Sequence, residues 1–168
     1  MELKKLSEQL IGLFGIEGIP DMAAALREAA LNQNTKIMDE FVTLVNGDLS
    51  VDWIQKIFQY YEADRKQKMQ DYTPKSLADL TGRLIGTCDT VIDLCAGSGA
   101  LTIQHWNRDK DCKFECIEYD DKAISYLLFN LAVRNIESVV KRMDVLSGEV
   151  FEAFKIIKGE QFAKVVKL

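Results

Sequence analysis

The sequence is poor in metal-binding residues. It contains a single histidine, His105, and four cysteines, none of them in a Cys-x-x-Cys pair. Zinc sites usually show closely spaced pairs of such ligands. The spacing therefore argues against a metal site, and reduced, buried thiols in a cytoplasmic protein are the simpler interpretation.

The sequence also lacks an excess of positive charge and a long apolar run. Its net charge is −5 and its pI is about 5.0, which argues against a nucleic-acid binder acting alone, although not against one part of a larger DNA-acting assembly. No apolar run is long enough to cross a membrane, and the amphipathic N-terminus does not resemble a signal peptide. At 168 residues and 48% hydrophobic content, the chain can form one domain, or one and a half, with a real core.

Residues 1–70 have the pattern of a helical region. Apolar residues recur there at helical spacing, first at Leu3, Leu6, Leu10, Leu13 and Phe14. Further helices are expected over residues 21–31 and 37–45, and a long one after a cap at Ser50 or Asp52. Such stripes usually form core, so this half predicts a helical domain and no ligand site.

The pattern changes at residue 90, where a short buried strand, a Gly-x-Gly turn and an amphipathic helix follow one another. Residues 90–94 predict the strand, and Gly97 and Gly99 form the turn. This arrangement presents backbone N–H groups to a nucleotide-like ligand. Gly97 is expected to permit the tight turn, and Gly99, which lacks a Cβ, to let the backbone approach the ligand. Thr102 occupies the place of the third glycine of a dinucleotide site, so a nicotinamide cofactor is disfavoured.

Two acidic residues follow the next predicted strands. Glu118 ends a strand over residues 114–118, about 20 residues beyond the glycines, where an acid often binds ribose hydroxyls. Asp144 follows a strand over residues 138–142. Each could equally be an ordinary surface acid. Asp120 or Asp121 is expected to cap a helix over residues 122–133.

These pieces together resemble a known family. The stretch from Asp93 to Ala100, Asp-Leu-Cys-Ala-Gly-Ser-Gly-Ala, resembles the cofactor loop of S-adenosylmethionine (SAM)-dependent methyltransferases, and Glu118–Tyr119–Asp120 matches the end of their second strand. Tyr72–Thr73–Pro74 before a helix, followed by this loop, resembles adenine-specific DNA methyltransferases, closest to the modification subunits of type I restriction systems. A structural interpretation is also available, with Thr73 as N-cap and Pro74 in the first turn of a helix over residues 76–85.

The resemblance implies a set of cofactor contacts and partners. The SAM-binding residues would be Tyr72, Thr73, Pro74, Asp93, Gly97, Gly99, Glu118 and Asp144. The first three would line the methionine end, Glu118 would bind the ribose, and Asp144 would accept from the adenine amino group. DNA, and specificity or other restriction-modification subunits, are the implied partners, with an oligomer left open and no membrane. The helical region would help to hold DNA and these subunits.

The implied fold is α/β, a Rossmann-like methyltransferase sheet of three to four parallel strands over residues 71–168, after a helical domain over residues 1–70. Residues 150–157 are expected to form a helix, and 162–166 a short strand or an extension of it. The family holds its flipped base with an Asn-Pro-Pro-Tyr tetrapeptide. This sequence has only Pro20 and Pro74, so the tetrapeptide is absent and no catalytic residue can be assigned.

Three explanations of that absence are open: an N-terminal fragment, which we favour, a natural relative that no longer methylates, or a chain completed by another. The leading hypothesis is the SAM-binding part of a DNA adenine N6-methyltransferase, with this chain alone inactive. The alternatives are a non-catalytic SAM-binding or assembly module, and a methyltransferase acting on RNA, protein or a small molecule.

Overall fold

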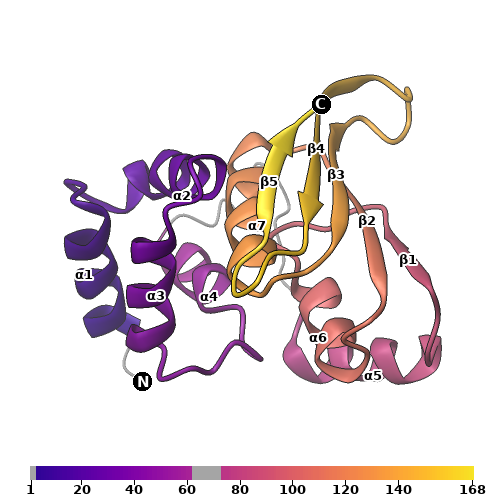
Figure 1. The fold of residues 1–168 in the computed structure, drawn as a ribbon, viewed down its shortest axis with the longest axis horizontal. Helices are drawn as coiled ribbons and strands as arrows, with labels where there is room; N and C mark the ends of the chain where they lie inside the picture. Colours follow the sequence, from indigo (N-terminus) through magenta and orange to yellow (C-terminus); the bar gives the residue numbers. More distant parts are fainter. Residues whose placement is uncertain (1–2, 62–72) are drawn as a thin grey trace.

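The computed structural model describes residues 3–61 and 73–168. The first range is helical, as expected, and forms one side of the molecule (Figure 1). Its elements are α1 (Leu3–Phe14), the 3-10 turn η1 (Ile19–Asp21), α2 (Met22–Leu31), α3 (Thr35–Leu44) and α4 (Trp53–Tyr61).

The ends of these helices are set by local chemistry. Asn34 caps α3 by accepting a hydrogen bond from the backbone N–H of Ile37 at 3.2 Å. Asp52 caps α4 in the same way, accepting from the N–H of Gln55 at 2.9 Å, so the second of the two predicted caps is the one used. Helix α3 ends before Asn46, which adopts a φ of 54° that asparagine tolerates well.

The second range alternates helices and strands. Its elements are α5 (Lys75–Ile85), β1 (Thr90–Asp93), α6 (Ala100–Arg108), β2 (Lys113–Glu118), α7 (Asp121–Val133), β3 (Ser138–Met143), β4 (Val150–Ile157) and β5 (Lys164–Lys167). They form one five-stranded sheet in the order β1-β2-β3-β4-β5, in which β1, β2 and β3 run parallel. The predicted α/β class is confirmed, with three parallel strands and an antiparallel pair, β4 and β5.

The prediction of a helix over residues 150–157 is wrong. These residues form β4, which pairs with β3 so that Phe154 lies opposite Val140. Phe154 and Ile156 are buried while Lys155 between them is exposed, the alternation of a strand that is covered on one face. Strand β5 confirms the short strand that was expected near residues 162–166.

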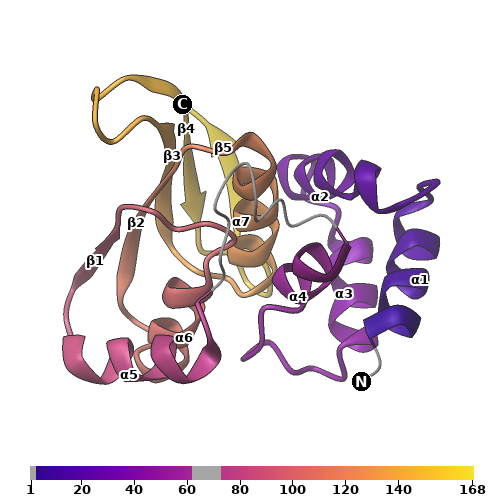
Figure 2. The same cartoon turned by 180° about the vertical axis from the view of Figure 1, so that it is seen from behind.

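Helix α7 packs between the helical region and the sheet. It contacts α2 and α4 on one side and β2, β3 and β5 on the other (Figures 1 and 2). Residues 124–133 of α7 are all buried. The rings of Phe129 and Phe41 pack edge-on, with their centroids 5.2 Å apart. The core is therefore continuous from the helical side to the covered face of the sheet.

The opposite face of the sheet is more open. Ile92, Glu115 and Lys155 lie in one row across it, and Ile92 is 59% exposed. Within the described ranges, no single helix has the length and hydropathy to span a bilayer; α1 and residues 19–31 pass that test only together, across a bend of 59°.

Candidate functional site

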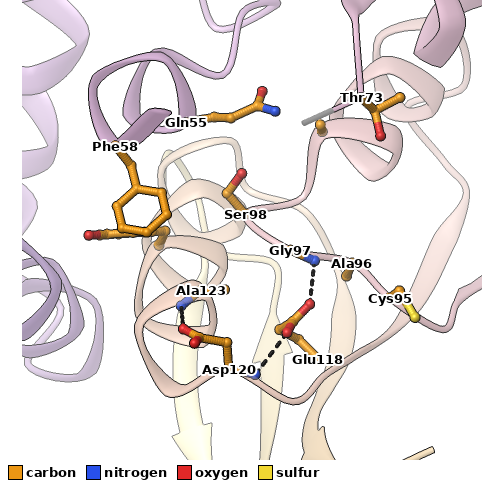
Figure 3. A pocket seen from close by; sticks show the side chains of 12 residues that line it. Gln55, Phe58, Thr73, Cys95, Ala96, Gly97, Ser98, Glu118, Asp120 and Ala123 are labelled. Atoms are coloured by element: carbon orange, nitrogen blue, oxygen red, sulfur yellow. Dashed lines mark hydrogen bonds between the residues drawn. The ribbon is translucent and has the colours of Figure 1, made fainter. Parts of the chain in front are cut away.

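A hollow lies at the carboxyl ends of β1 and β2, between the glycine loop, the start of α7 and α4 (Figure 3). It encloses about 690 Å³ of empty space, including its open mouth. Its lining residues are Gln55, Phe58, Thr73, Cys95, Ala96, Gly97, Ser98, Ala100, Glu118, Asp120, Ala123 and Tyr126. We call it the inner hollow.

The two glycines of the loop differ in what they make possible. Gly97 has a φ of 56°, and a Cβ at this position would meet only open space, so Gly97 serves the turn, as predicted. Gly99 has a φ of 99°, and a Cβ there would lie 2.9 Å from Cδ1 of Leu127 on α7. The absence of a Cβ at Gly99 thus permits close packing of the loop against α7, which differs from the expected approach to a ligand.

Glu118 joins the glycine loop to the end of β2. Its Oε2 accepts from the N–H of Gly97 at 2.7 Å, and its Oε1 accepts from the N–H groups of Tyr119 and Asp120, both at 2.8 Å (Figure 3). An ionised carboxylate has about four lone-pair sites, so three bonds leave it able to accept from a ligand hydroxyl. The side chain lines the inner hollow.

Asp93 supports the loop from the end of β1. Its Oδ2 accepts from the Thr102 hydroxyl at 3.1 Å, and its carboxylate also accepts from the backbone N–H of Cys95. Burial raises the pKa of Asp93, and it is not among the residues that line the inner hollow. This geometry favours a positioning role for Asp93. The same bond explains why threonine stands at position 102, the place of the third glycine of a dinucleotide site, because its hydroxyl donates to Asp93.

Sequence reasoning missed a buried network behind the loop. The Ser98 hydroxyl donates to Oδ2 of Asp52 at 2.7 Å, and Nδ2 of Asn130 donates to Oδ1 of Asp52 at 3.0 Å and to the Ser98 carbonyl at 2.9 Å. Arg134, one turn further along α7, donates to Oδ1 of Asn130 at 2.8 Å. The available signal was Asn130 within the apolar stretch 127–133, with Arg134 four positions later at the C-cap of α7.

Arg134 extends this network to the segment before α4. Its Nε and Nη2 donate to the carbonyls of Leu49 and Val51, both at 2.8 Å. Complete burial lowers the pKa of Arg134 to about 10, so the side chain is still a cation at neutral pH. The charge is compensated by Asp52, and the network fixes Asp52 and the glycine loop against α7.

Two of the three residues expected at the methionine end, Thr73 and Pro74, line the inner hollow or its neighbour. Thr73 lines it and also lines a neighbouring hollow, where Pro74 lies. Pro74 itself is the N-cap of α5, without a side-chain hydrogen bond, so the expected Thr73 cap is displaced by one residue. Tyr72 lies outside the described residues.

Asp144 lies in a second hollow, which shares Cys95 and Glu118 with the first. We call it the outer hollow; its lining is Leu94, Cys95, Glu118, Tyr119, Met143, Asp144 and Val145. Oδ1 of Asp144 accepts from the N–H groups of Leu146 and Ser147, and these bonds hold the pKa of Asp144 below its ordinary value. The structure thus brings Asp144 and Glu118 to one continuous depression.

The start of α7 confirms one further prediction. Oδ1 of Asp120 accepts from the N–H groups of Lys122 and Ala123, at 2.9 and 3.0 Å, so Asp120 is the N-cap of α7. The side chain also lines the inner hollow and adds negative charge near Glu118 (Figure 3).

Comparison with known proteins is consistent with this geometry. Residues 47–167 match the model of the family described as N-6 DNA Methylase. No curated protein and no solved structure gives a significant match. The family implies SAM as the methyl donor and DNA as the substrate. Because the match covers well over half of the 168 residues, the chain belongs to the N-6 DNA methylase family.

Proposed function

We propose that the chain is the SAM-binding part of a DNA adenine N6-methyltransferase and that SAM occupies the two joined hollows. The observation that carries this proposal is the position of Glu118. Its carboxylate orders the glycine loop through Gly97 and lines both hollows. A carboxylate that lines both hollows suits a ligand whose ribose lies between a base and an amino-acid end.

The chemistry of the outer hollow suits an adenine ring. Leu94, Tyr119 and Val145 offer apolar surface, and Leu94 and Tyr119 are 51% and 64% exposed. A planar base would cover this surface, which favours binding by removing apolar area from water. Asp144 has lone pairs left to accept from an exocyclic amino group, the role that the family resemblance implies.

The inner hollow suits the charged end of SAM. SAM carries an ammonium and a sulfonium, and the carboxylates of Glu118 and Asp120 line this hollow. Opposite charge at close range stabilises a bound cation. Gln55 and Thr73 add polar groups from the opposite side, so the ligand would be enclosed between α4 and the sheet (Figure 3).

The chemistry of the intact enzyme would be methyl transfer to the exocyclic nitrogen of adenine. The sulfonium of bound SAM supplies both the methyl group and a good leaving group. The residues of this chain would hold that methyl group in a fixed position, which is the alignment part of catalysis. The sequence has no Asn-Pro-Pro-Tyr, so we propose that this chain alone does not transfer the methyl group.

Calorimetric titration with SAM tests the site. We expect micromolar binding by the wild type and binding weaker by about 1.5–3 kcal/mol in Glu118→Gln, the range for a hydrogen bond to a charged group. Glu115→Gln is the matched control, because Glu115 lies on the same strand but is paired with Lys141 on the open face. No binding by the folded wild type, or equal losses in both variants, would contradict the proposed site.

Incubation with adenine-containing DNA and SAM labelled in its methyl group tests the second part. We expect the DNA to stay unlabelled at chain concentrations that saturate SAM binding. Time-dependent transfer of label to adenine would show that the chain carries its own catalytic residues.

A further inference from the structure

Three side chains that are well separated in the sequence lie close together at the amino ends of β1 and β2. Cys88 precedes β1, Cys112 precedes β2, and His105 lies on α6. One ligand atom from each lies within 4.8 Å of the other two. The cluster is at the opposite end of these strands from the two hollows, so the proposed SAM site does not account for it.

The imidazole of His105 is buried but poorly bonded. The residue is only 2% exposed. Its Nε2 lies 4.0 Å from Sγ of Cys88, the outer limit for a hydrogen bond to sulfur, and Nδ1 has no hydrogen-bond partner among the described residues. Buried polar atoms are nearly always bonded, so an imidazole left in this state needs an explanation.

The thiols of Cys88 and Cys112 lie beside this imidazole. Cys112 is 2% exposed, and Cys88 is half-buried. The Sγ of Cys112 donates to the carbonyl of Lys113, its own neighbour, at 3.3 Å. A bound cation would take both sulfurs as ligands, because a thiol that coordinates a metal ion is held as the thiolate.

We propose that Cys88, His105 and Cys112 bind one Zn²⁺ ion. Two thiolates and one imidazole are a preferred zinc ligand set. With Zn–S bonds of about 2.3 Å, tetrahedral geometry places two sulfurs roughly 3.8 Å apart. The three ligand atoms lie within 4.8 Å of one another, so their separations need to shorten by at most about 1 Å. A water molecule completes the coordination from the side of Cys88, the least buried of the three.

The ion would have a structural effect on the proposed SAM site. Helix α6 starts directly after Gly99. An ion bound to His105 and to the cysteines that precede β1 and β2 would therefore fix this helix against the two strands. Two protons leave the thiols when the ion binds and pass to solvent. The free protein therefore binds Zn²⁺ more weakly as the pH falls.

The other two cysteines are natural controls. Cys95 is exposed in the glycine loop, and Cys116 is buried on β2 with its Sγ 3.6 Å from the Thr102 hydroxyl. Neither belongs to the cluster. Cys95→Ser changes the number of thiols without touching the proposed ligands.

The test is titration of the reduced, metal-free full chain with Zn²⁺ against a chromophoric chelator, and with Co²⁺ as a spectroscopic probe. We expect one ion per chain and a thiolate-to-cobalt charge-transfer band. Cys88→Ser and His105→Gln should weaken Zn²⁺ binding by at least about 100-fold, since each removes a direct ligand. Cys95→Ser should bind as the wild type does.

Two results would overturn the proposal: no stoichiometric binding by the folded wild type, or equal affinity in wild type and His105→Gln. The cobalt spectrum of the wild type decides the question even if a variant fails to fold, because an octahedral spectrum without the charge-transfer band excludes thiolate ligation. None of these readouts depends on SAM, so the result is independent of the proposed function.

Discussion

The inner and outer hollows share Cys95 and Glu118 but are built differently. Behind the inner hollow, the buried Asp52–Ser98–Asn130–Arg134 network fixes the glycine loop. The outer hollow is bordered by the β3–β4 turn, where Leu146 is 98% exposed and the Asp144 carboxylate accepts from groups of its own turn. The inner end of the proposed site is therefore preorganised, while the outer end is a turn that is held by local bonds.

The largest effect is expected from breaking the support of the inner hollow. Arg134→Met removes a buried cation and leaves Asn130 and the carbonyls of Leu49 and Val51 without their donor. Losing one partner of such a buried charged network costs about 3–5 kcal/mol. Urea denaturation measures this loss. Arg83→Met, at an exposed Arg83–Asp79 pair, is the matched control and should change stability by under about 1 kcal/mol. Similar losses in both would refute the preorganised network.

Substitutions at Gly97 and Gly99 are expected to affect stability and SAM binding differently. Gly99→Ala places a Cβ near Leu127 at a φ of 99°, so we expect a loss of about 2–3 kcal/mol in the free energy of unfolding. Gly97→Ala meets open space, and its positive φ costs about 1–2 kcal/mol. SAM affinity should fall about tenfold, or 1.4 kcal/mol, only for Gly97→Ala, because only Gly97 lines the hollow. If the variant that loses more stability also loses more SAM affinity, these assignments are contradicted.

Asp93 predicts a pH dependence of stability. Burial and the charge of Glu118 raise its pKa, against the opposing hydrogen bonds from Thr102 and Cys95. The folded protein therefore holds this proton more tightly than the unfolded chain does. The resulting stability is complete below the ordinary value of 3.8 and is lost as the pH rises through the raised pKa.

Asp93→Asn removes this titration and keeps an oxygen acceptor for Thr102. The free energy of unfolding of the wild type, relative to the variant, should fall as the pH rises above the ordinary value of 3.8, with a slope of at most about 1.4 kcal/mol per pH unit. Asp111→Asn, at a fully exposed site, should run parallel to the wild type. A wild-type curve parallel to that of Asp93→Asn would disprove the effect.

The smallest effect on stability is expected in the outer hollow. Asp144→Asn retains the oxygen that accepts from Leu146 and Ser147, so denaturation should be nearly unchanged. SAM binding should weaken several-fold, because an uncharged amide is a poorer acceptor for the adenine amino group. An S-adenosylhomocysteine analogue with hypoxanthine in place of adenine lacks that amino group and should bind both proteins equally. An equal loss for both ligands would argue against the adenine contact.

The features that could be predicted from the sequence are those that depend on residues close together in the chain. The caps at Asp52 and Asp120 and the turn at Gly97 depend on a few adjacent residues, and each occurs where the patterns place it. Strand β4 was misassigned because its apolar residues suit a helix or a strand, and pairing with β3 decides between them.

The long-range contacts could not be predicted from spacing. The bond from Asn130 to Asp52 joins residues 78 positions apart. Cys88 and Cys112 approach each other only because β1 and β2 pair in parallel, with the N–H of Lys113 bonded to the carbonyl of Asp89. Glu118 was found from the sequence, but its bond to Gly97, 21 positions away, was not.

Helix α7 has a consequence for how the chain unfolds. Residues 124–133 are buried on every side, between the helices and the sheet. Neither half can separate without exposing this apolar helix to water, so cooperative loss of both halves is favoured over stepwise loss. The amides of α7 should then be among the slowest to exchange with deuterium, and they should report the opening of the whole molecule.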